Sequence, residues 1–362
     1  MLVYFPTLCV ITLGCLSAGY LAIDIGMEAE HEVINTEESF VITHPPDVSD
    51  NYNHVEEVIE RIEHRSILAE KRIKEGILPI EYTEELYSKM AEEVEELVDF
   101  ANETINVYNF LNAKGIERTI LPNIGIDYAP LKRQLLLLIK KLFDVAPITT
   151  NAVMPMGIVD KVLDIFDEDD NLALKAHALD ILYVWLPDNP RIQTRVMKMK
   201  GLEPFYYQIP KLDSSVIVQL LDLFNKISEE HVKARTKDVQ RSKADHERLK
   251  LYQRIGLIER MSTPTFCNGL LNILETTWSY NTDDNEMAKP IFEVIKNVRP
   301  FCINIFKAKP RHTKLFHVLL NYVDNPIKVA YFENKGMNIT EMREILNEYS
   351  SVTSDISLKD EL

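Results

Sequence analysis

The side chains that could carry out chemistry lack the spacing that catalytic and cofactor sites require. The sequence contains no G-x-x-x-x-G-K-[ST] or G-x-G-x-x-G loop to hold a phosphate, and no H-E-x-x-H, C-x-x-C or G-x-S-x-G motif. The nine histidines are scattered, and His44 and His54 are not accompanied by carboxylates at ligand spacing. The sequence therefore predicts no catalytic residue, no bound metal and no cofactor, and the protein is not expected to be an enzyme.

The stretch "DIFDEDDN", Asp164 to Asn171, is the one that most suggests a cation site, because it gathers several carboxylates. A calcium-binding EF-hand loop needs a glycine at its sharp turn and a glutamate at its twelfth position, and both are missing here. We therefore interpret this stretch as an acidic turn between two helices.

The two ends of the chain resemble targeting sequences. The last four residues are the tetrapeptide that the KDEL receptor retains in the endoplasmic reticulum: Lys359, Asp360, Glu361 and Leu362. An apolar run from Leu2 to Leu16 predicts a signal peptide over residues 1–19, although no Lys or Arg precedes the run. No later apolar stretch reaches the length of about 18 residues that spans a bilayer, so no membrane insertion is expected. The expected location is the lumen of the endoplasmic reticulum.

Two kinds of covalent modification are open to a chain in that compartment. Cys267 and Cys302, 35 positions apart, are the cysteines left after removal of the signal peptide. They can form one disulfide or remain two buried thiols, and both alternatives stay open. The sequons at Asn102 and Asn338 are candidate glycosylation sites, with access to Asn102 limited if it lies within a helix.

Composition excludes some partners and favours helices. The 362 residues include 56 acidic and 40 basic side chains, and the formal net charge of -16 argues against nucleic acid and anionic membrane as partners. Only 11 glycines occur, which disfavours tight-turned β architectures and suits helices joined by short corners. Hydrophobic residues make up 46% of the chain, enough for a core that needs no disulfide framework.

Composition and pattern divide the chain into segments. Residues 20–53 are acidic, weakly patterned and interrupted by two prolines, so they are interpreted as a disordered lead-in. Residues 54–93 show the apolar spacing of amphipathic helices, the second of which is expected to open near Thr83. Residues 94–350 form the predicted repeat domain, and residues 351–362 are its tail.

The repeat domain is indicated by glycines at a nearly constant interval. Gly115, Gly157 and Gly201 are separated by 42 and 44 residues, and Gly256 follows after 55 because a charged insertion occupies about 229–250. Each glycine corner is followed by a short apolar segment, a turn and a long apolar helix. This period predicts an all-α, armadillo- or HEAT-like helical solenoid of about four repeats. The long helices are expected at 130–143, 172–186, 215–228 and 286–299.

The unit from Asn189 to Ser228 resembles an armadillo repeat, with an opening Asn-Pro, a glycine corner, a short second helix, an Asp at the turn and a third helix. In armadillo proteins the third helices line the concave face that wraps a protein partner. Spacings of three and four residues place each trio below on one face of its helix. The candidate partner-binding residues are Gln134, Leu137 and Lys141; His177, Asp180 and Val184; Gln219, Asp222 and Lys226; and Pro290, Glu293 and Asn297.

The combination of a lumenal signal, an acidic lead-in, four armadillo-like repeats and a KDEL tail resembles the Sil family, the armadillo-type nucleotide exchange factors of the lumenal heat-shock chaperone BiP. The likeness runs from Val94 to Tyr349 in architecture and is best in the third repeat and in Tyr252 to Leu274. It implies a non-enzymatic co-chaperone that embraces one lobe of the BiP ATPase domain and promotes ADP release, in support of protein folding and translocation.

Two other functions are compatible with the same residues. A lumenal scaffold or cargo adaptor would use the same groove for a different protein, and an enzyme of unknown type is the third possibility. Under the exchange-factor hypothesis, Asp180, Asp222 and Glu293 would offer negative charge to basic groups on the chaperone.

Overall fold

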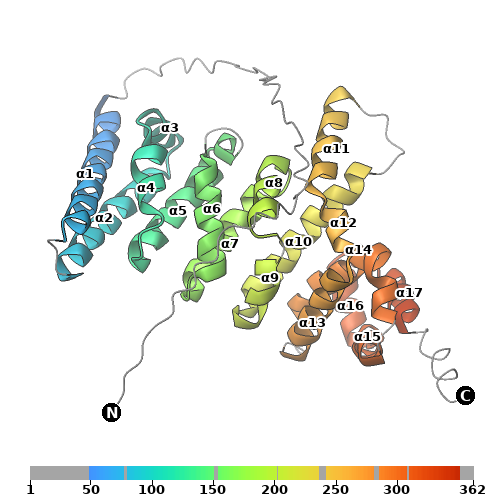
Figure 1. The fold of residues 1–362 in the computed structure, drawn as a ribbon. Coiled ribbons are helices and arrows are strands. Elements are labelled where there is room, and N and C mark those ends of the chain that lie inside the picture. Colours follow the sequence, from blue (N-terminus) through green and yellow to red (C-terminus); the bar gives the residue numbers. More distant parts are fainter. Residues whose placement is uncertain are drawn as a thin grey trace, which may run out of the picture. The chain divides into compact units, whose positions relative to one another are not determined.

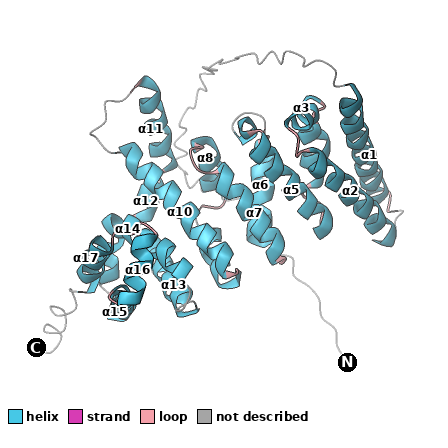
Figure 2. Ribbon diagram, turned by 180° about the vertical axis from the view of Figure 1, so that it is seen from behind, coloured by secondary structure: helices cyan, strands magenta, loops and turns pink. Residues whose placement is uncertain are grey.

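All regular structure in the described part of the chain is helical. The computed structural model describes residues 49–76, 80–150, 154–201, 203–235, 242–280, 285–307 and 310–350. No strand occurs among these residues, as Figure 2 shows, which confirms the predicted all-α class. The predicted signal peptide, most of the predicted lead-in and the KDEL tail lie outside the described residues.

The elements follow one another with short connections. The first part of the chain forms α1 (Ser49–Lys74), α2 (Ile80–Phe100), α3 (Thr104–Asn112), η1 (Ile116–Ile120), α4 (Leu121–Asn123), α5 (Ala129–Val145), η2 (Pro147–Thr150), α6 (Met156–Glu168) and α7 (Leu172–Trp185). The second part forms α8 (Pro190–Met199), α9 (Glu203–Gln208), η3 (Ile209–Lys211), α10 (Ser214–Arg235), α11 (Lys243–Ile255), α12 (Leu257–Met261), α13 (Pro264–Tyr280), α14 (Asn285–Lys307), α15 (Pro310–Val323), α16 (Pro326–Asn334) and α17 (Ile339–Ser350). Figure 1 labels most of these helices along the ribbon.

The four long helices expected from the repeat are α5, α7, α10 and α14, and each packs against the next. The series continues at both ends, because α2 packs on α5 and α17 packs on α14. We call α2, α5, α7, α10, α14 and α17 the ladder helices. The regular packing of one repeat on its neighbour agrees with a helical solenoid, and the ladder extends by one helix beyond the predicted units on each side.

Each inner ladder helix buries two apolar stripes because it has a neighbour on either side. In α5, Leu131, Leu135 and Leu138 lie on one stripe, while Ile139 and Phe143 belong to the other, and all five are buried. Spacings of three and four residues put each stripe on one face of the helix. Burying a side chain of this size contributes about 1.5–3 kcal/mol, so the packing between repeats is the main source of stability.

Large aromatic residues fill the core between repeats. Trp185 is fully buried, its ring lies 5.2 Å from that of Phe143, and its indole Nε1 donates a hydrogen bond of 2.7 Å to the carbonyl oxygen of Thr150. Trp278 is also buried and meets the ring of Tyr322 edge-on at 4.7 Å. Both tryptophans therefore belong to the core, as the apolar helical pattern around them indicates.

The acidic stretch from Asp164 to Asn171 begins within α6, which ends at Glu168, so its interpretation as an inter-helix turn is right for residues 169–171 and wrong for residues 164–168. Lysines from neighbouring elements neutralise it: Lys200 lies 3.3 Å from Asp164 and 2.7 Å from Glu168, and Lys132 lies 2.8 Å from Asp169. These hydrogen bonds raise the pKa of Lys200, with the bond to Glu168 as the largest cause. The carboxylates of this stretch are therefore paired with lysines of the protein itself. The Asn171 side chain caps the N-terminus of α7.

The four repeat glycines do not play equivalent roles. Gly201 and Gly256 have φ angles of 73° and 67°, in the left-handed region expected of a corner glycine. Gly115 has a helical φ of -60°, and Lys114 before it takes the left-handed conformation instead. A Cβ on Gly115 would lie 2.2 Å from the ring of Phe110, so close packing is what requires glycine there. Gly157 sits in the first turn of α6.

The helical part of the chain begins earlier than its pattern suggests. Because α1 starts at Ser49, the expected lead-in is wrong for residues 49–53, and α2 starts at Ile80 instead of near Thr83. Ion pairs at 3.0–3.2 Å from Arg61 and Arg65 to Glu93 join α1 to α2. These contacts make residues 54–93 part of the same packed array as the repeats.

The charged insertion lengthens α10 to Arg235 and adds α11, which packs on α8 and α10. Tyr252 of α11 is buried and donates a hydrogen bond to Glu230 of α10. Beside this contact, the fully buried His231 ring lies 2.8 Å from the Gln193 side-chain oxygen and 4.6 Å from the Tyr252 ring. Burial is the main cause that lowers the pKa of His231 to about 4.

We predict that Gly115→Ala lowers the free energy of unfolding by about 1–3 kcal/mol, because the added methyl group forces the buried Phe110 ring to move. Gly157→Ala is the matched control: its Cβ would meet only Leu121 at 3.4 Å, and it should be neutral or stabilising by up to about 1 kcal/mol. Urea unfolding of both variants measures the difference, and equal stabilities would contradict the close-packing explanation.

Stability should also depend on pH through His231. Its folded pKa of about 4 lies below the ordinary 6.5, so the unfolded state binds the proton more readily. Stability contributed by the neutral ring is present above pH 6.5 and is lost as the pH falls toward 4, by up to about 3 kcal/mol. His231→Gln should therefore show a shallower fall in unfolding free energy over this window than His246→Gln, which changes an exposed histidine. Parallel curves for the two variants would refute the assignment.

Candidate partner-binding face

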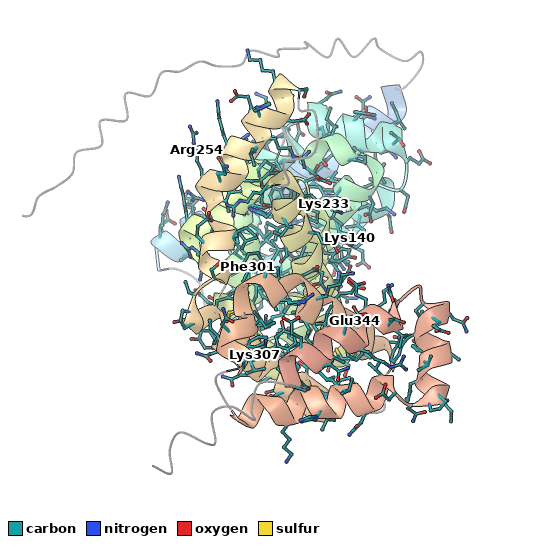
Figure 3. All side chains as sticks on the ribbon, turned by 90° about the vertical axis from the view of Figure 1, so that its right-hand side faces the viewer. Lys140, Lys233, Arg254, Phe301, Lys307 and Glu344 are labelled. Atoms are coloured by element: carbon teal, nitrogen blue, oxygen red, sulfur yellow. A yellow bond between two sulfur atoms is a disulfide. The ribbon has the colours of Figure 1, made fainter. Side chains whose placement is uncertain are left out.

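Every candidate partner-binding residue lies on a ladder helix, and none of them is buried. The trios lie on α5, α7, α10 and α14, where all members are exposed or partly exposed. This follows from the packing described above, because two sides of each ladder helix are covered by its neighbours. Figure 3 shows the side chains that the helices carry, with Lys140 of α5 and Lys233 of α10 labelled. The remaining strip of each ladder helix is what a partner could contact.

Between α7 and α10, the second and third trios are connected by hydrogen bonds. The Gln219 side-chain amide donates to Asp180 Oδ1 at 2.9 Å, and His177 Nδ1 lies 3.8 Å from Asp180 Oδ2. The nearby His177 ring is the largest cause that lowers the pKa of Asp180, helped by the hydrogen bond from Gln219 and opposed by burial. Asp180 is therefore a carboxylate at neutral pH whose charge already has partners within the protein.

A second connection between the same helices centres on Tyr183, which is not among the candidate residues chosen from the sequence. Tyr183 donates a hydrogen bond to Asp222 and accepts one from Lys226. Lys226 also lies 3.1 Å from Asp222, and its ammonium stands 3.8 Å from the centre of the Tyr183 ring. Tyr183, Asp222 and Lys226 thus form one cluster that is open to solvent on the exposed side.

The third and fourth trios meet through asparagines. Asn225 of α10 donates to the carbonyl oxygen of Pro290 at 3.2 Å and accepts from Asn297 of α14 at 3.1 Å. A proline inside α14 cannot donate a backbone hydrogen bond. The buried Asn225 therefore fixes α10 against α14 at the place where partner-binding residues were expected, and Asn297 serves this contact.

These residues border an open hollow of ≈ 730 Å³ between α10 and α14, which we call the α10–α14 hollow. Five of the candidate partner-binding residues line it: Gln219, Asp222, Lys226, Pro290 and Glu293. Its other lining residues are Tyr183, Ser215, Val218, Asn225, Glu229, Glu286, Lys289, Tyr331 and Lys335. The remaining candidates, on α5, on α7 and at Asn297, lie outside the hollow.

The residues missed from the sequence fall into two groups. Tyr183 lies three residues after Asp180 and Glu229 lies three residues after Lys226, so each extends a predicted trio along the same face of its helix. An aromatic residue at this spacing is the signal that could have identified Tyr183 from the sequence. Tyr331 lies on α16 and Lys335 directly follows it, and this helix belongs to no predicted repeat. Only the packing around the end of the ladder brings α16 to the hollow.

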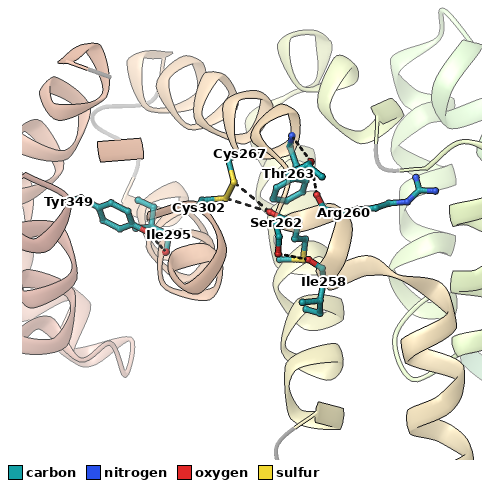
Figure 4. The surroundings of a disulfide bond; sticks show 10 residues. Ile258, Arg260, Ser262, Thr263, Cys267, Ile295, Cys302 and Tyr349 are labelled. Carbon is teal, nitrogen blue, oxygen red and sulfur yellow. Dashed lines mark hydrogen bonds between the residues drawn. A yellow bond between two sulfur atoms is a disulfide. The ribbon is translucent and has the colours of Figure 1, made fainter. Parts of the chain in front are cut away.

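The cysteines and sequons are placed clearly. Cys267 of α13 and Cys302 of α14 form a disulfide with a Cα–Cα distance of 5.4 Å, which decides between the two alternatives. Figure 4 shows the sulfur atoms beside the chain at the end of α12, where Met261 O lies 3.5 Å from the Cys267 sulfur.

Both glycosylation sequons are exposed. Asn102 lies in the turn between α2 and α3, so the limited access expected for it within a helix is wrong. Asn338 lies just before α17.

Two further properties concern the described residues alone. Among them, no group of three or more His, Cys, Asp or Glu side chains is arranged to hold a metal ion. None of the helices in the described ranges combines the length and apolar character needed to cross a bilayer.

We predict that the double variant Cys267→Ala/Cys302→Ala loses about 2–4 kcal/mol of unfolding free energy, because the bond closes a 35-residue loop in the unfolded chain. Thiol titration of the denatured wild-type chain from residue 20 onward should find no free thiol. Reduction of the wild type before unfolding should bring it to the stability of the double variant. Two titratable thiols in the oxidised wild type would contradict the bond.

Two comparisons with known proteins identified no relative of this chain. No protein-family model matches the sequence, and no curated protein matches it significantly.

Proposed function

We propose that this chain is a nucleotide exchange factor for a BiP-type lumenal heat-shock chaperone, whose ATPase domain it binds along the exposed strip of the ladder helices. The observation that supports this most is that exposed and partly exposed side chains, polar and apolar, occur at the predicted positions of α5, α7, α10 and α14, and that five of those on α10 and α14 line the α10–α14 hollow. Repeat proteins bind other proteins on surfaces of this kind. The identity of the partner comes from the resemblance to the Sil family.

The proposed activity needs no catalytic group, only a difference in affinity. If the strip binds the open ATPase domain more tightly than the closed, ADP-bound domain, it must weaken ADP binding by the same factor that ADP weakens the complex. A coupling of about 1–3 kcal/mol corresponds to roughly 5- to 150-fold weaker ADP binding. The protein would then act by holding one conformation of its partner.

The three carboxylates proposed for charge contacts differ in what they can offer. Asp180 accepts from Gln219 and Asp222 accepts from Tyr183, so both connect α7 to α10. Reversing their charge would break contacts within the ladder as well as contacts to a partner. Glu293 lines the hollow without bridging α10 to α14 in this way, and it is the better position for a test.

The proposed location is the lumen of the endoplasmic reticulum, with retention by the KDEL receptor. A disulfide between Cys267 and Cys302 suits an oxidising compartment. The sequons at Asn102 and Asn338 lie on exposed turns, where a glycan can be attached without disturbing the core.

We predict that the chain from residue 20 onward, at low micromolar concentration, accelerates the release of fluorescent ADP from purified BiP in a stopped-flow experiment. Glu293→Lys should reduce the acceleration at least severalfold, because it places a positive charge in the hollow. The exposed Glu117→Lys, in η1, is the matched control and should behave as the wild type. Absence of acceleration by the wild type would refute the exchange-factor function. Capture of a different lumenal protein in stoichiometric amount, without BiP, would favour the adaptor alternative.

A further inference from the structure

The α10–α14 hollow carries an arrangement of charges that points to the chemistry of its occupant. Its described lining residues include four carboxylates and three lysines: Asp222, Glu229, Glu286 and Glu293, and Lys226, Lys289 and Lys335. Two tyrosines, Tyr183 and Tyr331, also line the hollow. An acidic wall with aromatic faces is a site for a cation on a partner.

The lysines of the hollow are themselves held in cation-binding positions. Lys226 lies over the Tyr183 ring and within 3.1 Å of Asp222, and Lys335 lies 5.7 Å from the centre of the Tyr331 ring. Lys289 donates to the carbonyl oxygen of Lys335 at 3.2 Å. Each lysine ammonium group therefore contacts either a hydrogen-bond acceptor or an aromatic ring.

Lys226 is the best-placed of these internal cations and also a replaceable one. Burial lowers its pKa, but the hydrogen bonds to Tyr183 and Asp222 outweigh burial and raise it, so the side chain is charged at neutral pH. The pair with Asp222 spans one helical turn, and both side chains are 45% exposed. Exposed ion pairs of this kind are weak, so a cation that fits Asp222 and Tyr183 better can displace the lysine into solvent.

We propose that the α10–α14 hollow receives an arginine side chain of the partner protein, which takes the place of Lys226 over Tyr183 and on Asp222. A guanidinium group fits this site better than an ammonium group, because it is planar, stacks on an aromatic ring and donates two parallel hydrogen bonds to one carboxylate. It is also less strongly hydrated, so it leaves water more easily. Lys226 is then an internal substitute that fills the site until the partner arrives.

The inference deepens the proposed function, since it names the chemistry of the contact, but its test does not require BiP. The first probe is a hexa-arginine peptide, whose binding to the chain from residue 20 onward is measured by calorimetry at low salt. Lys226→Ala should tighten peptide binding about two- to fivefold, which is the range of an exposed cation–π pair. Asp222→Asn should weaken it, and a hexa-lysine peptide should bind more weakly than hexa-arginine.

The control variant is Lys74→Ala, which removes the same charge from the same kind of pair, with Glu70 one turn away on α1. It should leave peptide binding within the error of the wild type. If Lys226→Ala tightens binding no more than Lys74→Ala, or weakens it, Lys226 is not a substitute for the partner's cation and the proposal is wrong. Thermal melting of each variant shows whether the ladder is intact.

The second probe is the BiP ATPase domain, and it separates this inference from the proposed function. Tighter binding of the domain by Lys226→Ala, with Lys74→Ala unchanged, would support both. If the wild type accelerates ADP release but Lys226→Ala does not bind more tightly, the inference fails and the function stands. If BiP is not bound at all while the peptide series keeps its order, the function fails and the arginine site stands, for another basic partner.

Discussion

Most of the structure depends on the packing of each ladder helix against two neighbours of the same kind. A helix covered on two sides must bury two apolar stripes, which is why α5 is rich in leucine around most of its circumference. Only one narrow strip is left for polar residues. Stability and the location of the candidate binding face therefore have a single cause: residues that pack between repeats are unavailable for binding, and residues that face outward from the ladder are available.

The outward strip is not a set of independent side chains. Asp180 binds Gln219, Asp222 binds Tyr183, and Asn225 reaches α14. Groups that are candidates for contact with a partner are also the polar connections between successive ladder helices. A partner that bound these groups would therefore act on the same atoms that align neighbouring repeats, so a local contact would favour one arrangement of the ladder over another.

The sequence predicts the fold well because the repeat has a strong period and the long helices have strong apolar patterns. It predicts the site less well, for identifiable reasons. The helical spacing identified Asp222 and Lys226 as candidates, but it cannot show that Tyr183 of the previous repeat completes their cluster. It could not place α16 at the hollow, because that helix lies outside the period. The regular spacing of the glycines also does not show that glycine is required for two different reasons. Gly201 adopts a left-handed backbone conformation, whereas Gly115 lies in close contact with an aromatic ring.

The disulfide between α13 and α14 affects how the stack can deform. Helices joined only to their neighbours behave like springs in series, and the total displacement is shared among the joints according to their stiffness. A covalent crosslink makes the joint between α13 and α14 the stiffest of those in the described chain, whose other joints depend on packing, hydrogen bonds and ion pairs. Because the bond fixes α13 on α14, elastic strain imposed by a bound partner would be taken up at the joints between successive ladder helices, none of which carries a covalent crosslink in the described chain.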